Sequence, residues 1–180
     1  MKRKVVVPLI LLVVFTSFIL FFIPMKEAFT FTEQRTEDPE MYYIPLKSDR
    51  GFQIRYVHSI HLTDVFENYE VTVDHKIKLL SMQYENLAIG LPGSAEEEGE
   101  SFSFKDGVYT LTYDDKVIDS FVLFIGDVDA ELAFRYLGNE INLKQQLERG
   151  KSYAFRVTKL SYYQMLKGGN LNGNKETAAR

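Results

Sequence analysis

Polar side chains of the kinds that bind ligands, metals or protons are concentrated between Arg55 and Glu70. The guanidinium of Arg55 presents a planar fork of donors that matches a carboxylate. Hydroxyl groups and a histidine follow closely and would add hydrogen bonds to such a ligand. The pattern predicts a non-catalytic site for a small organic anion, with these candidate binding residues: Arg55, Tyr56, His58, Ser59, Thr63 and Glu67.

A second interpretation of this segment is a metal site, because His58, His61, Asp64 and Glu67 recur every three residues. On a helix they would share one face and offer nitrogen and oxygen ligands to zinc. The alternative function is therefore a metal-dependent hydrolase of the cell envelope that uses His58, His61 and Glu67. The surrounding Val, Ile and Tyr residues favour strands, on which odd spacings alternate between faces, so we assign no catalytic residue, metal or cofactor.

A hydrolytic Ser-His-Glu system of Ser59, His58 and Glu67 is a third interpretation. Adjacent strand residues point to opposite faces, so His58 would not easily activate Ser59, and the sequence has no Gly-x-Ser-x-Gly elbow. The simplest interpretation is structural: Arg55 pairs with Glu67 across adjacent strands, while His58 and Ser59 hold the turn. A purely structural envelope domain is the function that follows from it.

A loop punctuated by Gly and Pro after an expected strand is a second candidate segment. Its glycines would let backbone donors approach a ligand. The acidic run at residues 94–100 is interpreted as a solvated loop, because calcium loops space their ligands in alternation. The candidate loop residues are Gly90, Leu91 and Pro92.

The chain after Gly51 consists mainly of short β-rich runs separated by turn residues. Asp106-Gly107 is a typical two-residue hairpin turn, and Asn142 would cap a short helix near residues 143–148. This pattern predicts an all-β domain, an antiparallel sandwich or partly closed barrel of about eight strands. The expected strands are 52–59, 65–73, 76–84, 101–104, 108–113, 117–125, 131–137 and 152–160.

An uncharged apolar run from Val5 to Ile23 would form a helix of about 28 Å, close to the ~30 Å hydrocarbon core of a bilayer. Three basic residues precede the run, so the positive-inside rule predicts a cytoplasmic N-terminus and an extracytoplasmic remainder. Ala28 with Lys26 before it is a poor cleavage site, which favours a retained signal anchor and a single-pass protein of the cell membrane.

These features divide the chain into four predicted segments. Polar residues with Pro39 and Pro45 indicate a stalk, which leads into a first strand at Met41–Pro45. The Gly- and Asn-rich end is predicted to be disordered. The segments are a basic head and transmembrane signal anchor (1–24), a stalk and first strand (25–50), an extracytoplasmic β-domain (51–166) and a disordered tail (167–180).

Composition excludes several classes of function. Only three of the 21 Lys and Arg residues precede residue 25, whereas all 25 Asp and Glu residues follow it, so the outer part is acidic. A nucleic-acid partner would need a basic face. The chain has no cysteine, which removes disulfides, thiol nucleophiles and thiolate metal sites.

Two stretches resemble a family of small bacterial and archaeal proteins of unknown function. That family is encoded beside tripartite ATP-independent periplasmic (TRAP) transporters with TAXI-type solute-binding proteins. The resemblance implies an accessory role beside an organic-anion transporter, with a permease or a solute-binding protein as partner. The matched positions are Arg55, His58, Ser59, Thr63 and Glu67 within Phe52 to Tyr69, followed by Gly90-Leu91-Pro92.

Overall fold

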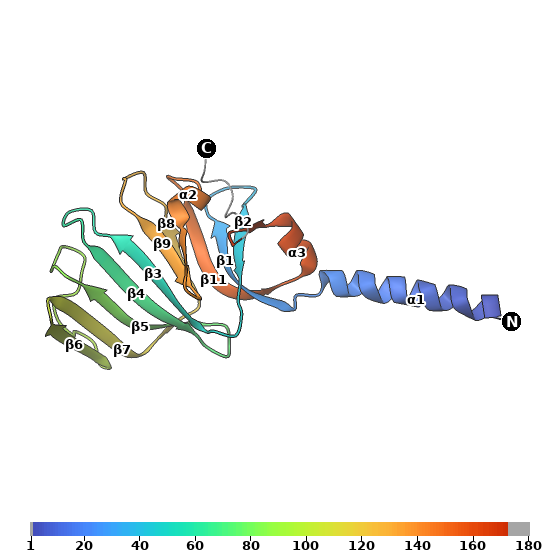
Figure 1. The fold of residues 1–180 in the computed structure, drawn as a ribbon, viewed down its shortest axis with the longest axis horizontal. Coiled ribbons are helices and arrows are strands. Elements are labelled where there is room, and N and C mark those ends of the chain that lie inside the picture. The colour runs from blue at the N-terminus through green and yellow to red at the C-terminus, as the bar shows by residue number, and fades with distance from the viewer. Residues whose placement is uncertain (1, 173–180) are drawn as a thin grey trace.

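The computed structural model describes residues 2–172, with the backbone alone for residues 2–6 and 8. The described chain is an all-β sandwich, from which the helix α1 (Lys2–Phe22) projects to one side (Figure 1). The other elements are β1 (Lys26–Glu33), β2 (Met41–Pro45), β3 (Gly51–Val57), β4 (Asp64–Val71), β5 (Ile77–Tyr84), β6 (Glu100–Lys105), β7 (Val108–Ile118), β8 (Phe121–Phe124), β9 (Leu132–Tyr136), β10 (Asn139–Asn142), α2 (Leu143–Gln146), β11 (Ser152–Leu160), α3 (Tyr162–Lys167) and β12 (Gly169–Asn170).

Two sheets form the sandwich within the described residues. The small sheet has the order β12-β2-β1-β11-β8, and the large sheet has the order β10-β9-β3-β4-β5-β7-β6. Neighbouring strands are antiparallel except for β12 beside β2. The all-β class predicted from the sequence is confirmed, and the described strands form two open sheets instead of a closed barrel.

Aromatic rings fill the space between the two sheets. The ring of Phe29 in β1 lies 5.0 Å, centroid to centroid, from the rings of Phe52 and Phe134 in the large sheet. The ring centroids of Phe31 and of Phe155 in β11 are also 5.0 Å apart. Such rings bury large apolar areas and add favourable edge-to-face contacts. The numerous Phe and Tyr residues of the chain therefore supply the core that a domain without disulfides needs.

Residues 26–33, which the sequence pattern assigns to a stalk, instead form β1 in the middle of the small sheet. This strand pairs with β11 from Lys26↔Leu160 to Glu33↔Tyr153 and with β2 on its other side. Its central residues are buried. The alternation of Ala28, Thr30 and Thr32 with Phe29 and Phe31 is a strand pattern that the proline-rich segment behind it obscured.

The acidic stretch around residues 114–116, expected to be a turn, lies inside β7. This strand pairs with β5 as far as Ile77↔Ile118, across a register shift opposite Leu80. After Asp119 and Ser120 the chain enters β8, which pairs with β11 in the other sheet. The side chains of this stretch are exposed to solvent, so a strand can carry charged residues here. The chain crosses between the sheets here.

Local turn and capping signals are confirmed. Asp106 and Gly107 have positive φ and join β6 to β7 in a two-residue hairpin. The Asn142 side chain accepts a hydrogen bond from the backbone of Lys144 and caps α2. A second two-residue turn at Leu137-Gly138 adds the strand β10, which the sequence analysis did not predict.

The C-terminal segment is ordered for several residues beyond the predicted end of the domain. Lys167 ends α3, β12 pairs with β2, and Leu171 is buried in the core. The disordered-tail prediction is therefore wrong for residues 167–172. The rest of that prediction, residues 173–180, lies outside the described residues.

The apolar side chains of α1 are exposed along the helix, by 42–63% at its large hydrophobic residues from Val7 to Phe22, except Phe21. Among the residues described in full, no helix is both long and apolar enough to span a bilayer. The last turn of α1 contacts α3, where the Phe22 and Tyr163 rings lie 5.0 Å apart. The side chains of the basic head lie outside the described part.

Candidate functional site

Two loops that contain most of the candidate residues meet at one end of the large sheet. The loop at residues 58–63 joins β3 to β4, and the loop at residues 85–99 joins β5 to β6. His58 connects them, because its Nε2 lies 3.4 Å from the carbonyl oxygen of Ile89. Its Nδ1 accepts from the Ile60 backbone at 3.3 Å, so the proton of a neutral ring lies on Nε2 and points at Ile89.

The first loop is closed by its own backbone. The His58 N–H donates to the Thr63 carbonyl, and the Leu62 N–H donates to the His58 carbonyl, both at 2.9 Å. Thr63 is half-buried and Ser59 is exposed. The prediction that His58 holds the turn is therefore confirmed for its backbone and ring.

Glu67 lies on the inner face of the large sheet, because it is two residues from each of the buried residues Val65 and Tyr69 along β4 and therefore shares their face. Its carboxylate accepts a hydrogen bond from the Tyr69 hydroxyl at 2.7 Å, and Tyr56 is a second hydrogen-bond partner. Burial raises the pKa of Glu67 more than these two hydrogen bonds lower it. The same burial, with the nearby Glu67 charge, raises the pKa of Tyr56 and of Tyr69.

The Gly90-Leu91-Pro92 segment covers this part of the sheet. The Tyr84 hydroxyl donates to the Pro92 carbonyl, and the Leu91 N–H closes a turn on Ala88 at 3.0 Å. Gly90 has a φ of +91°, which suits glycine, whereas an added Cβ would meet nothing within 4 Å. The glycine therefore serves the turn and does not provide a close approach. A cavity of about 370 Å³ lies between this loop and Tyr113.

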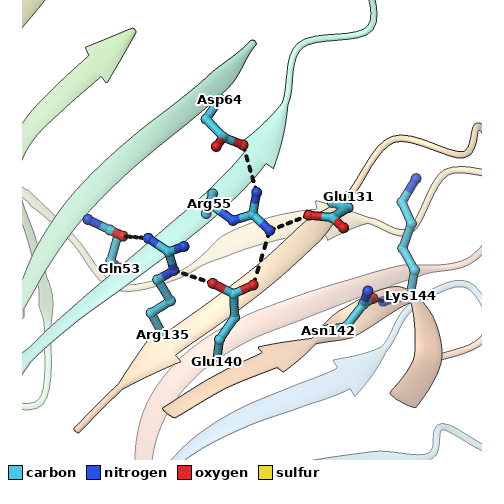
Figure 2. A network of polar contacts seen from close by, with 8 residues as sticks. All are labelled: Gln53, Arg55, Asp64, Glu131, Arg135, Glu140, Asn142 and Lys144. Carbon is cyan, nitrogen blue, oxygen red and sulfur yellow. Dashed lines mark hydrogen bonds and ion pairs between the residues drawn. The ribbon is translucent and has the colours of Figure 1, made fainter. Parts of the chain in front are cut away.

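Arg55 lies on the opposite, outer face of the same sheet (Figure 2). Its Nη1 donates to Asp64 at 2.7 Å, and its Nη2 donates to Glu140 at 3.0 Å and to Glu131. Of the three Arg55 guanidinium nitrogens, only the buried Nε lacks a hydrogen-bond partner among the described residues. The side chain is 12% exposed, so its outward donors are already occupied by protein carboxylates.

Arg135 extends this outer network (Figure 2). It donates to Glu140 and, at 3.0 Å, to the amide oxygen of Gln53, and its guanidinium lies over the ring of Phe66. Sequence analysis missed Glu131, Arg135 and Glu140, although the expected strand at 131–137 contained part of the signal. The pairing of the two glutamates with Arg55, and of Arg135 with Glu140 and Gln53, depends on β9 lying beside β3, which no local pattern specifies.

The structure therefore divides the predicted site into three places. Arg55 is on the outer face, Tyr56 and Glu67 are on the inner face, and His58, Ser59 and Thr63 are in the loop. The expected Arg55–Glu67 pair is wrong, because Glu67 is opposite Ile54 and Arg55 is opposite Phe66 in the register of β3 and β4. Ile54 and Arg55 are adjacent in β3 and point to opposite faces, so Glu67, which is opposite Ile54, lies on the face away from Arg55.

The catalytic alternatives gain no geometric support. The His58 and His61 rings lie 5.7 Å apart, but Glu67 lies on the inner face of β4 with Tyr69. Among the described residues no group of three or more His, Asp or Glu side chains could hold a metal ion. Glu67 also accepts hydrogen bonds from tyrosines, so it does not orient His58 for attack by Ser59.

We expect Glu67→Gln to stabilise the fold at pH 7. A raised pKa means that the folded protein holds the Glu67 proton more tightly than the unfolded chain, so stability falls as pH rises above the unfolded value near 4.5. Glutamine keeps an acceptor for Tyr69 and removes this dependence. The advantage should vanish at low pH, as measured by urea unfolding at several pH values.

The exposed neighbour Glu70 provides the control for that experiment. Glu70→Gln should leave the pH dependence of the free energy of unfolding unchanged. If Glu67→Gln is destabilising at pH 7, Glu67 is a stabilising carboxylate in the folded protein. If its effect is independent of pH, folding does not shift the pKa of Glu67. Either result would show that our account of Glu67 is wrong.

The fold and these contacts define a β-sandwich domain with a largely buried carboxylate on the inner face of its large sheet and a network of arginine–carboxylate pairs on the outer face. The chain belongs to the family described as a domain of unknown function (DUF1850), whose profile matches residues 52–143, just over half of the 180 residues. The prediction of an uncharacterised family is thereby confirmed. No curated protein and no solved structure matches the chain.

The matched segment begins in β3 and ends at the start of α2. It contains the large sheet apart from Gly51, both meeting loops and the Arg55 network. The strands β1, β2 and β11 of the small sheet lie outside it. The family pattern is therefore centred on the sheet that carries the candidate residues.

Proposed function

We propose that the protein is a membrane-tethered, non-catalytic accessory component of a TRAP-type organic-anion transporter, and that its sandwich binds another protein. The observation that carries this proposal is an exposed apolar patch on the two meeting loops. We call it the distal patch, because both loops lie at the end of the sandwich away from α1 (Figure 1). It consists of Ile60, Leu62, Leu87 and Ile89.

The exposure of the distal patch is unusually high for large aliphatic side chains. Ile89 is 90% exposed and Leu62 is 75% exposed. Clustered exposed apolar residues are a mark of interaction sites, whereas single ones are ordinary. The His58–Ile89 contact brings the two loops next to one another, and we therefore treat these four side chains as one surface.

The apolar surface of α1 supports the tether. Its described large apolar side chains are exposed along most of the helix, and Phe21 and Phe22 in the last turn contact Tyr163. Lys26 lies over Tyr162 at the same level. Aromatic and basic residues beside an apolar helix are typical of a membrane–water interface. A tether raises the effective concentration of the domain near a membrane partner.

The position of the distal patch favours a water-soluble partner over a permease. It faces away from the proposed membrane surface, and the acidic run at 94–100 belongs to the same loop as Leu87 and Ile89. We therefore propose the transporter's solute-binding protein, with an apolar surface flanked by basic groups. Direct capture of an organic anion by Arg55 stays a prediction, but one that would require displacing its carboxylate partners.

Site-specific photo-crosslinking in native membranes tests this function. A photoreactive residue at Ile89 should capture the solute-binding protein, identified by mass spectrometry. The matched control is Val122, a 61% exposed residue on β8 of the other sheet, which should capture none. Ile89→Asp should weaken the association at least about tenfold, because a charge replaces an apolar contact.

Three results would each contradict a part of the proposal. If the photoreactive residue at position 89 captures no transporter component, the proposed partner is wrong. Equal capture from positions 89 and 122 would mean that the distal patch has no special role. If alkaline carbonate releases the protein from membranes, the proposed membrane tether is wrong, whatever the partner.

A further inference from the structure

A cavity of about 690 Å³ lies at the opposite end of the sandwich, beside α3. Its walls come from the segment before β2, from β2 itself and from the end of α3. The groups that matter for its chemistry are Asp38, Glu40, Tyr42, Tyr163 and Lys167. The cavity thus combines two carboxylates, one ammonium group and two aromatic rings.

This cavity lies next to the point where α1 meets the domain. Tyr163 lines it and also lies 5.0 Å, ring to ring, from Phe22 in the last turn of α1. On α3, Leu166 is 77% exposed and Tyr162 is exposed. Figure 1 shows α3 on the side of the sandwich from which α1 projects. If α1 is the tether proposed above, the cavity opens at the depth of lipid headgroups.

The charged groups that line the cavity each contact one of its tyrosines or another charge. Glu40 accepts a hydrogen bond from the Tyr42 hydroxyl at 2.6 Å, which raises the pKa of Tyr42 to about 12. The Lys167 ammonium lies 5.2 Å from the centre of the Tyr163 ring. A hydrogen bond with Tyr163 and the nearby Asp38 charge raise the pKa of Lys167, so a cation and carboxylates lie close together in the lining. The lining therefore offers carboxylate acceptors to a cation and, beside them, a charged donor to an anion.

We infer that this cavity binds the headgroup of a phosphatidylethanolamine lipid. The primary ammonium of the headgroup donates to Asp38 and Glu40, and its phosphate accepts from Lys167. A primary ammonium has three donors for carboxylate oxygens, whereas a choline group has none. The site therefore distinguishes ethanolamine from choline lipids and holds the domain at a fixed position on the membrane. This inference rests on the proposed tether.

Lipid nanodiscs of defined composition test the inference with the full-length protein. One set contains phosphatidylglycerol with phosphatidylethanolamine, and the other contains phosphatidylglycerol with phosphatidylcholine. We expect a higher melting temperature in the ethanolamine set, and native mass spectrometry should show retained ethanolamine lipid. Soluble phosphoethanolamine should reproduce part of the shift if the headgroup alone is recognised, and none if the acyl chains are needed; either result supports the site.

Paired variants separate the cavity from the general surface charge. Asp38→Asn with Glu40→Gln should weaken retention of the ethanolamine lipid about tenfold or more, because charged acceptors are replaced by neutral ones. The glutamine can still accept from Tyr42. Glu37→Gln, in the same segment but outside the cavity lining, should leave retention unchanged.

The outcomes distinguish this inference from the function on which it rests. The headgroup site is wrong if the protein enters both sets of discs and has equal melting temperatures in them. It is also wrong if the preference for ethanolamine lipid persists in the paired variant. Neither result contradicts the tether. Failure of the protein to remain with discs of either composition overturns the tether and the headgroup site together.

Discussion

Phe29→Ala should lower the free energy of unfolding by about 3–5 kcal/mol, the largest effect that we expect from one substitution. Phe29 is fully buried, and its ring lies 5.0 Å from the rings of Phe52, Phe134 and Tyr136. Truncation leaves a cavity between the sheets that rigid neighbouring strands cannot close. Urea unfolding of the full-length protein in detergent, followed by circular dichroism, measures the loss.

Phe124→Ala is the matched control, because it removes the same side chain from a position that is 62% exposed. Its effect should be well below 1 kcal/mol. Equal effects of the two substitutions would mean that β1 is peripheral and that residues 26–33 behave as the stalk that the sequence suggested.

Arg55→Met should lower the free energy of unfolding by about 2–3 kcal/mol at pH 7. The substitution keeps much of the side-chain volume but leaves Asp64, Glu131 and Glu140 close together without their shared cation. A fully buried pair would cost about 3–5 kcal/mol, and we reduce that figure because the carboxylates are 40–57% exposed.

This effect should also depend on pH with a defined sign. Partial burial would raise the pKa of Glu140, but hydrogen bonds from Arg135 and Arg55 outweigh it, so the pKa lies below the usual value of 4.5. A lowered carboxyl pKa stabilises the fold above the unfolded value, and that stability is lost as pH falls. The difference between wild type and Arg55→Met should therefore shrink below about pH 4.5.

Arg149→Met provides the comparison for this prediction. Arg149 pairs with Asp129, which is 92% exposed, so its loss should cost less than about 1 kcal/mol at any pH. If Arg55→Met is as mild as Arg149→Met, the network is a surface feature. Arg55 would then be available to a ligand, as the sequence pattern suggested.

The fold class was predictable because the signals for it are local. Alternation of apolar residues defines strands such as Phe52–Val57, and Asp106-Gly107 defines its hairpin by backbone conformation alone. The position of β1 was not predictable in this way, since its partner β11 lies more than a hundred residues later. β7 was divided wrongly because charged residues were taken as a turn, although one exposed strand face accommodates them.

The candidate residues were found more readily than their relationships. Parity along one strand was sufficient to separate Arg55 from Tyr56, and it would have separated Arg55 from Glu67 had the register of β3 and β4 been known. The contact of His58 with Ile89 joins two loops that are about thirty residues apart. Such contacts arise from sheet order, so composition and spacing alone do not reveal them.

The pairing of β1 with β11 sets the order in which the protein becomes complete. The first strand of the chain remains without one of its two neighbours until residues 152–160 have been synthesised. Until then, Phe29 and Phe31 lack their contacts with Phe155 of β11. Exposed apolar surface and an unpaired strand edge favour aggregation of a folding chain. The small sheet therefore cannot be completed before β11 has been synthesised, and we expect this long-range pairing to slow the assembly of the sandwich.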